Sequence, residues 1–319
     1  MGCKPMITDG ESPGWQRCAG PDPAAAPPTA VILGAIMGSC APAVRLRRMV
    51  HLLAFTMLAL YAGSFVCYAL NLRAPSRWIG RTASFLLAAG IVAQYFALYV
   101  RSVALHAVPY DDLYGSMSLF AWLLALTYLG LELFHRERAV GAFVTAVLLV
   151  WLSAVWLWIP DPVAVPAQIR GPIFAFHVTL NTWAYAAFAL SFILSAIYVA
   201  QNRLLRSRRL SLAFWRFPAL DVLERMSRSS VIIGLAALVV GVTFGLIWQH
   251  RLNGAVSLGD PKVVITLAIA GVYVAYLALG RNATWRGARA AMLCVANFMV
   301  VLFSYTFVNL YLTRFHRFL

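Results

Sequence analysis

The chain has 319 residues, of which 62% are hydrophobic and only 12% are charged, and its mean hydropathy is +0.77. A soluble domain of this length cannot bury so much apolar surface, so the composition excludes a soluble globular protein and predicts a membrane protein. The net charge of +15 does not indicate nucleic-acid binding, because the basic residues gather between apolar segments, as membrane topology requires.

Residues 1–48 differ from the rest of the chain. They are rich in Pro, Gly and Ala and contain three cysteines. Their apolar patch, TAVILGAIMG, is too short to span a bilayer and lacks the layout of a signal peptide. We expect residues 1–48 to be a disordered leader or an artefact of the start site, with Met49 as an alternative start.

Eight apolar runs follow the leader. A helix needs ~20 residues to cross the hydrocarbon layer, and each run is continuously apolar, whereas barrel strands alternate over about ten residues. The sequence therefore predicts an all-α, polytopic helical bundle of about eight transmembrane helices over residues 49–319. The runs cover residues 49–72, 82–105, 114–134, 139–159, 172–201, 229–248, 262–280 and 288–312.

The basic residues predict how the helices are oriented. If the first run starts outside, fifteen arginines fall on the inner side and six basic residues on the outer side, which agrees with the positive-inside rule. We therefore expect a multi-pass protein of the cell inner (plasma) membrane with its C terminus on the outer, periplasmic side. Arg45, Arg47 and Arg48 oppose the rule at the first helix. The inner set is Arg73, Arg77, Arg81, Arg136, Arg138, Arg203, Arg206, Arg208, Arg209, Arg216, Arg225, Arg228, Arg281, Arg286 and Arg289, and the outer set is Arg101, Arg170, Arg251, Lys262, Arg314 and Arg317.

Histidines are unevenly distributed in this topology. Of the six histidines, only His135 falls on the inner side. Each outer histidine taken alone is typical of a headgroup contact, but together they indicate an outward-facing site, because polar side chains in a membrane protein are costly and often functional. The outer histidines are His51, His106, His177, His250 and His316.

His177 is the strongest single candidate. In RGPIFAFHVTLNTW, Pro172 suits a first helical turn, which places His177 about one and a half turns, or ~7 to 8 Å, below the helix start. Asn181 follows on the same helical face. The alternative interpretation is a histidine that is hydrogen-bonded to a neighbouring helix.

A second group of candidate site residues lies between the sixth and seventh apolar runs, in the stretch WQHRLNGAVSLGDPK. Trp248 ends one helix and Arg251 follows it, while Asp260 and Pro261 form a helix start that needs no function to explain it. This loop opens on the same side as His177 and His316, so the sequence allows these residues to converge.

These segments resemble the CcsA/HemX-like integral membrane proteins of cytochrome c assembly over most of residues 95–319. DDLYGSMSLFAW is similar to the family stretch NLYESLxFLSW, and its helix continues to an acidic residue, here Glu132. The segment FAFHVTLNTW resembles the one that holds the first outer heme-ligating histidine of the family, which matches His177. FVNLYLTRFHRFL resembles the closing VNLLxxGLHSY, which matches its second histidine to His316.

The resemblance implies a b-type heme, bound without covalent attachment and ligated on its two faces by His177 and His316. No CxxC is present for covalent attachment, and Cys67 and Cys294 fit as buried apolar residues. Trp248 and Asp260 are included in the implied pocket, and Arg251 and Arg314 are candidate partners of the heme propionates, because guanidinium groups match carboxylates.

The chain departs from the family pattern in two places. The family loop reads about WGxxWxWDPKE, and here its three tryptophans are replaced by Asn253, Ser257 and Gly259. A family histidine within the membrane, in YLHTR, corresponds to Leu279 in YLALGR. Both departures suit the HemX-like branch better than a complete synthase, because aromatic side chains in the loop pack against the porphyrin.

Three functions remain open from the sequence. The first is presentation or translocation of heme at the outer face for attachment to apocytochrome c, with a CcsB-type membrane partner, at most as a subunit of a heme-attachment complex. The second is a HemX-like regulatory or scaffold protein that affects heme biosynthesis without binding heme. The third, a permease, is disfavoured because intramembrane charges and broken helices are not evident. The lipid bilayer is a partner in each case, and nucleic acid is not.

Overall fold

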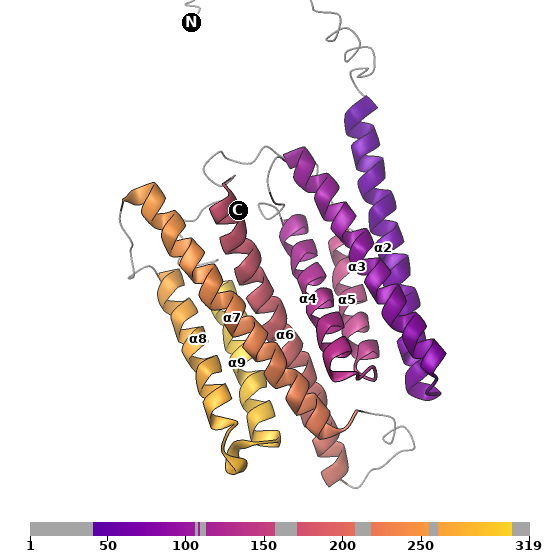
Figure 1. Cartoon of the computed structure of the whole chain (residues 1–319), viewed down its shortest axis with the longest axis vertical. Helices are drawn as coiled ribbons and strands as arrows, with labels where there is room; N and C mark the ends of the chain where they lie inside the picture. Colours follow the sequence, from indigo (N-terminus) through magenta and orange to yellow (C-terminus); the bar gives the residue numbers. More distant parts are fainter. Residues whose placement is uncertain are drawn as a thin grey trace, which may run out of the picture. The chain divides into compact units, whose positions relative to one another are not determined.

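The computed structural model describes residues 41–105, 108, 113–156, 171–207, 218–254 and 261–307, which contain eight α-helices, one short 3-10 helix and no strand (Figure 1). The chain divides into two units, Met1–Leu46 and Arg47–Leu319, and the packing described here is that of the second unit. The predicted all-α class is confirmed. The helices are α2 (Ala41–Arg73), α3 (Arg77–Leu105), α4 (Leu113–His135), α5 (Gly141–Trp156), α6 (Pro172–Arg206), α7 (Leu220–Asn253), α8 (Pro261–Leu279), η4 (Ala283–Trp285) and α9 (Ala288–Phe307).

Every predicted apolar run lies largely within one of these α-helices. Five helices are long and apolar enough to cross a membrane over their described residues: α2, α3, α4, α6 and α7. Three shorter apolar helices, Gly141–Val155, Val263–Leu279 and Ala288–Phe303, account for the remaining runs. Together they confirm a helical membrane bundle.

Three helices begin well before their apolar runs. Helix α2 starts at Ala41, within the segment assigned to the leader, α3 starts at Arg77 rather than near residue 82, and α7 starts at Leu220 rather than near residue 229. In the first turns of α7, Asp221 and Arg225 lie four residues apart and form an ion pair of 2.6 Å. Such a pair supports a helix in water, so the helix continues past the segment that hydropathy alone detects.

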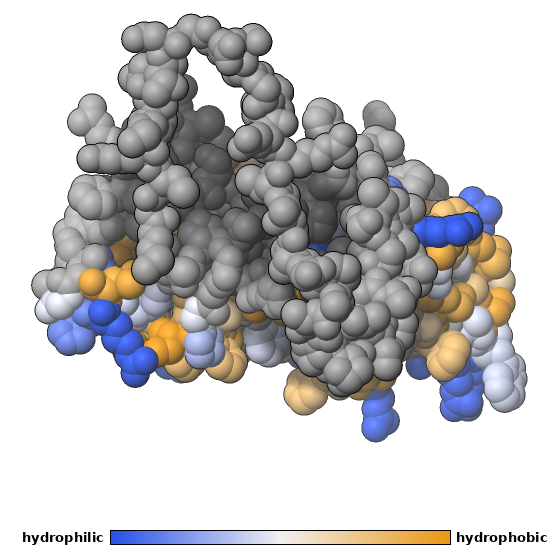
Figure 2. Space-filling model, turned by 90° about the horizontal axis from the view of Figure 1, so that it is seen from above, coloured by the Kyte–Doolittle hydropathy of each residue, from blue (hydrophilic) through white to orange (hydrophobic). Residues whose placement is uncertain are grey.

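The described surface carries large apolar side chains that a soluble protein would bury. Phe134, Trp78 and Phe85 are 78%, 76% and 71% exposed. Figure 2 shows orange hydrophobic residues on the flanks of the described part of the chain. Apolar patches of this kind fit contact with lipid rather than with water.

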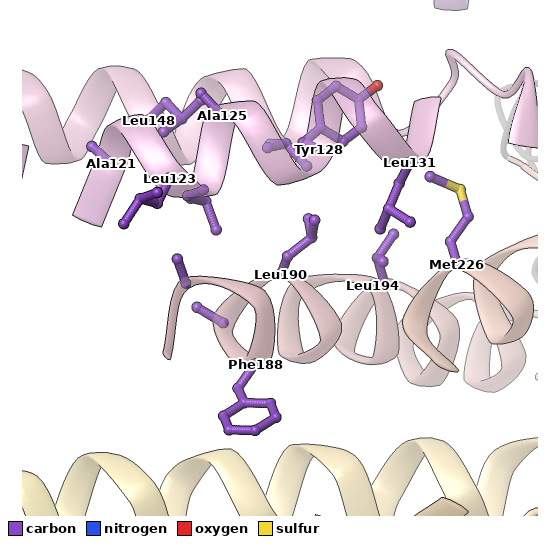
Figure 3. Close-up of a cluster of buried hydrophobic side chains, with 14 of the residues drawn as sticks. Ala121, Leu123, Ala125, Tyr128, Leu131, Leu148, Phe188, Leu190, Leu194 and Met226 are labelled. Carbon is purple, nitrogen blue, oxygen red and sulfur yellow. The ribbon is translucent and has the colours of Figure 1, made fainter. Parts of the chain in front are cut away.

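The centre of the second unit is formed by α4, α6 and α7. In Figure 3, Leu190 and Leu194 point from α6 toward α4, while Phe188 points away from the opposite face of α6. Phe188 stacks on Tyr273 of α8 with ring centroids 3.9 Å apart. Helix α6 therefore packs on both sides, and the indole of Trp183 also donates a 2.9 Å hydrogen bond to Thr127 of α4.

Glycines let α7 approach α6 very closely. A Cβ added at Gly234 would lie 2.6 Å from Phe188 Cε1 and 3.2 Å from the carbonyl oxygen of Ala184. A Cβ added at Gly241 would lie 3.0 Å from the side-chain nitrogen of Asn181. Small residues at the contact are the usual way for membrane helices to gain packing, because lipid supplies no hydrophobic force between them.

Polar side chains inside the unit form hydrogen bonds between helices. Tyr61 of α2 donates to Gln94 of α3 at 2.7 Å, and Gln94 donates to the carbonyl of Ser118 in α4 at 2.9 Å. On the other side of α6, the hydroxyls of Ser191 and Ser227 are 2.8 Å apart, and Ser191 is 2.9 Å from the thiol of Cys294. Such bonds satisfy groups that the hydrocarbon cannot solvate.

We predict that Gly234→Ala destabilises the protein, because its new methyl group would overlap the ring of Phe188. Overpacking of this kind typically costs about 1–3 kcal/mol. The matched control is Gly271→Ala, where a Cβ meets nothing within 4 Å and the better helix propensity of alanine applies without a clash. Thermal unfolding in detergent, followed by tryptophan fluorescence, should give a lower midpoint for Gly234→Ala only. Equal midpoints for the two variants would contradict the close α6–α7 packing.

Candidate functional site

His177 lies in the second turn of α6. The helix starts as the sequence predicted, with Gly171 in an extended conformation (φ −71°, ψ 150°) and Pro172 in the first turn. Proline fits this position because the amide of the first turn has no partner within the helix. The side chain of His177 is half-buried against α7.

The imidazole of His177 is tied to the backbone of α7. Its Nδ1 is 2.8 Å from the carbonyl oxygen of Gly241. A carbonyl only accepts, so we assign the proton of the neutral ring to Nδ1, which leaves the lone pair on Nε2. Nε2 has no hydrogen-bond partner among the described residues.

Asn181 supports this geometry from the next turn of α6. Its side-chain nitrogen is 3.0 Å from His177 Nδ1 and 2.7 Å from the carbonyl oxygen of His177. Because the protonated Nδ1 is already a donor, Asn181 donates to the carbonyl. The predicted polar face that begins with His177 and continues to Asn181 is therefore present, and it faces α7.

A glycine makes room for the imidazole. A Cβ added at Gly245 would lie 2.4 Å from both Cε1 and Nδ1 of His177, so any larger residue would displace the ring. Gly241 and Gly245 form the pattern G-x-x-x-G in the stretch GVTFG. Our sequence analysis missed this partner, although the pattern is a recognisable sign of close helix contact.

Aromatic rings extend the site toward the end of α7. The ring of Phe174 lies 6.1 Å from that of His177 and 4.5 Å from that of Trp248. Trp248, which the sequence placed near this site, is thus separated from His177 by one ring. Phe174 was not predicted, although it lies three residues before His177 on the same helix face.

The other predicted site residues are only partly described. Arg251 is exposed in the last turn of α7. The helix ends at Asn253 and is capped by Gly254 in the left-handed conformation (φ 70°). Asp260, Arg314 and His316 lie outside the described residues, as does Arg170. The pairing of His177 with His316 stays a prediction.

The chemistry of this site is that of a single neutral imidazole. The described residues contain no group of three His, Cys, Asp or Glu side chains that could hold a metal ion, and a free zinc ion needs three or four such ligands. A metal already held in a macrocycle needs only axial ligands. His177 suits that role, because a ligating histidine usually donates its other N–H to a carbonyl or carboxylate.

A small cavity lies elsewhere in the second unit. It measures about 10 Å³ and is lined by Ser195, Ser227, Tyr276 and Glu224 together with apolar residues, so it is large enough for about one water molecule. None of its lining residues contacts His177 in the described structure. The cavity therefore does not belong to the His177 site.

Comparison with known proteins gives one consistent family. Residues 110–316 match the family described as Cytochrome C assembly protein. The chain is 26% identical to Protein HemX of Brevibacillus brevis over 248 residues, covering 77% of this chain and 91% of that protein. It is 25% identical to Protein HemX of Bacillus subtilis (82% and 95%) and 26% identical to Cytochrome c biogenesis protein CcsA of Synechococcus sp. strain CC9311 (79% and 94%).

We predict that His177 carries its proton on Nδ1. Solid-state NMR of the full chain labelled with ¹⁵N-histidine distinguishes the two neutral tautomers, and His177→Gln identifies the signal. Gly245→Ala should shift or broaden this signal, because the methyl group displaces the ring from Gly241. Gly271→Ala serves as the control that leaves it unchanged. A signal of the Nε2-protonated form in the unmodified chain would contradict the assignment.

Proposed function

Because this chain belongs to the cytochrome c assembly protein family, we propose that it acts in cytochrome c biogenesis by binding heme through His177. The heme is cargo, presented or translocated at the outer face of the membrane for attachment to apocytochrome c. Relatives over most of the chain include proteins named for cytochrome c biogenesis. By itself the chain is at most one subunit of a heme-attachment complex.

One observation carries the proposal. The Nδ1–H of His177 is engaged by the carbonyl of Gly241 at 2.8 Å, which leaves the lone pair of the neutral ring on Nε2. A histidine prepared in this way needs no change of tautomer to ligate iron. The residues present therefore fit one axial position of a heme.

The remaining parts of the proposed site come from the sequence. His316 supplies the second axial ligand, and the heme is b-type because no CxxC is available to attach it. Arg251 and Arg314 pair with the propionates, and Trp248 shields an edge of the site. Asp260 acts at the start of α8, where it caps the helix next to the cargo.

The proposal also includes location and partners. The protein resides in the inner (plasma) membrane with its C terminus on the outer, periplasmic side, where apocytochrome c is available. A CcsB-type membrane protein completes the complex. The described part of the chain contains eight α-helices, an even number, and this count and the excess of arginines on the other side support this orientation.

A second candidate function is a HemX-like regulatory or scaffold protein that affects heme biosynthesis without ligating heme. Two observations favour it. The loop after α7 has Asn253, Ser257 and Gly259 where the family has tryptophans, and the chain covers most of the length of two proteins named HemX. The two functions differ in whether the purified protein holds heme.

We predict that the purified full chain contains low-spin b-type heme with sharp reduced bands in its absorption spectrum. His177→Ala and His316→Ala should each convert the spectrum toward high spin or lose the heme, and added imidazole should partly restore the low-spin form. His135→Ala is the control, because His135 is bonded to Ser229 (3.1 Å) near the other end of the bundle. Heme-free protein, or unchanged spectra in both variants, would favour the scaffold function.

We predict that a phosphatase fused after Leu319 is active and that a cytoplasmic fluorescent protein fused there is dark. This outcome follows from an even number of spans and from the distribution of arginines. The matched control is the same pair of reporters fused after His135, at the end of α4, where the results should be reversed. An inactive phosphatase after Leu319 would place His177 on the inner face and contradict the proposed heme delivery.

A further inference from the structure

The turn between α2 and α3 carries three arginines that the proposed heme site does not use. Arg73 ends α2, Arg77 begins α3, and Arg81 follows four residues later. All three residues are exposed, and none of them forms an ion pair with a carboxylate among the described residues. The turn is therefore a concentration of positive charge that the described part of the protein does not neutralise.

The sequence explains why carboxylates are scarce near this turn. Residues 23–110 contain no Asp or Glu, so neither α2 nor α3 has an acidic side chain of its own. The turn between α4 and α5 lies close by, because a Cβ added at Gly80 would be 3.0 Å from Cδ of Arg138. Any counter-charge from the described protein would have to come from that turn.

The carboxylates of the α4–α5 turn are already engaged. Glu132, near the end of α4, accepts hydrogen bonds from the hydroxyls of Tyr68 and Ser84. Arg138 has its Nε 3.4 Å from Oε1 of the same carboxylate. Glu137 accepts a 2.9 Å hydrogen bond from a backbone N–H in its own turn. The described protein thus leaves the counter-charge of the α2–α3 turn to another molecule.

A second arginine-rich segment shows that this situation is not general. The segment between α8 and α9 also carries three arginines, but there the protein supplies partners. Arg286 pairs with Glu224 at 3.6 Å, and Arg289 donates a 3.1 Å hydrogen bond to the carbonyl of Thr284. Only Arg281 of that segment has no such partner among the described residues. The α2–α3 turn is therefore the better anion site of the two.

Exposed apolar side chains continue from the arginines along both helices. On α3, Phe85 lies one turn beyond Arg81 and is exposed. On α2, Leu70 and Val66 lie one and two turns before Arg73 and are also exposed. Helical residues with these spacings share a face. Each helix thus presents charge at its end and an apolar surface deeper in the membrane, which is the order of headgroup and acyl chain in a phospholipid.

Trp78 lies at the junction of the charged and apolar surfaces. Its side chain is 76% exposed, and Cζ of Arg81 lies 5.8 Å from the centroid of its ring. Tryptophan is enriched at the level of the lipid headgroups. A cation–π contact does not use the N–H donors of the guanidinium, so those of Arg81 stay available to a phosphate.

We propose that the α2–α3 turn binds the headgroup of an anionic phospholipid. The guanidinium groups of Arg73, Arg77 and Arg81 donate hydrogen bonds to the phosphodiester oxygens, and the acyl chains lie along the exposed faces of α2 and α3. Clusters of basic residues next to membrane helices attract anionic lipids in this way. An acidic soluble protein would match the charge, but it would not cover the apolar side chains that continue from it.

The experiment uses the full chain without heme in phosphatidylcholine vesicles, so its result does not depend on the heme function. Spin-labelled phosphatidylglycerol and spin-labelled phosphatidylcholine with the same acyl chains are added separately. Electron paramagnetic resonance measures the fraction of each label that is immobilised at the protein. We expect phosphatidylglycerol to be immobilised in preference, and we expect this preference to fall as added salt screens the charges.

Two triple variants locate the site. The variant of the α2–α3 turn should lose most of the preference for phosphatidylglycerol, and the control variant, which removes the same charge from the α8–α9 segment, should keep most of it. If the first variant does not insert into the membrane, Arg77→Gln alone carries the test and should lower the preference about twofold. The first variant combines Arg73→Gln, Arg77→Gln and Arg81→Gln, and the control combines Arg281→Gln, Arg286→Gln and Arg289→Gln.

Three outcomes would overturn the proposal. Equal immobilisation of the two lipids by the unmodified chain would leave an acidic protein as the better occupant. An equal loss of preference in the two triple variants, or no loss in the α2–α3 variant and in Arg77→Gln, would mean attraction by the overall positive charge. Inorganic phosphate added at constant ionic strength should leave the preference intact, and loss of the preference would identify a site for free phosphate instead.

Discussion

The close approach of α7 to α6 is the contact on which the rest of the structure depends. Gly234, Gly241 and Gly245 lie on one face of α7, and a methyl group at any of them would press against Phe188, Asn181 or His177. The absence of side chains exposes the backbone of α7 to α6, and the carbonyl of Gly241 becomes the acceptor for His177. The packing of the two helices and the tautomer of the histidine therefore have a single cause.

The two ends of the bundle solve the problem of buried polar groups differently. Near the start of α6, a neutral imidazole satisfies a neutral carbonyl, and Asn181 adds a bond without adding charge. Near the end of α4, Glu132 brings a charge that needs two hydroxyls and an arginine from three other segments. Burying a neutral hydrogen-bonded pair in the outer margin of the membrane costs little free energy. Burying an ionisable group costs much more, so such a group is found close to water.

Much of the fold followed from composition, because membrane helices need long apolar runs and the chain has eight. The sequence also predicted the depth of His177 from Pro172, since that relation lies within one helix. It did not predict the acceptor of His177, because GVTFG signals close packing but does not say which helix packs there or in which register. The partners of Glu132 were missed for the same reason, since Tyr68 is 64 positions away and Ser84 is 48 positions away.

The acceptor on Nδ1 also bears on how firmly a ligand is held. A carboxylate in that position would draw the proton toward itself and make the imidazole a stronger donor to iron, whereas a backbone carbonyl polarises it less. For the proposed heme-handling function, a weaker ligand suits a protein that must release its cargo to another chain. The fixed tautomer offsets the weaker ligation, because no proton has to move from Nε2 before the histidine can bind iron. Under the proposed function, the contacts at Gly241 and Gly245 would keep His177 in the tautomer that binds iron and leave it a weak enough ligand to release heme.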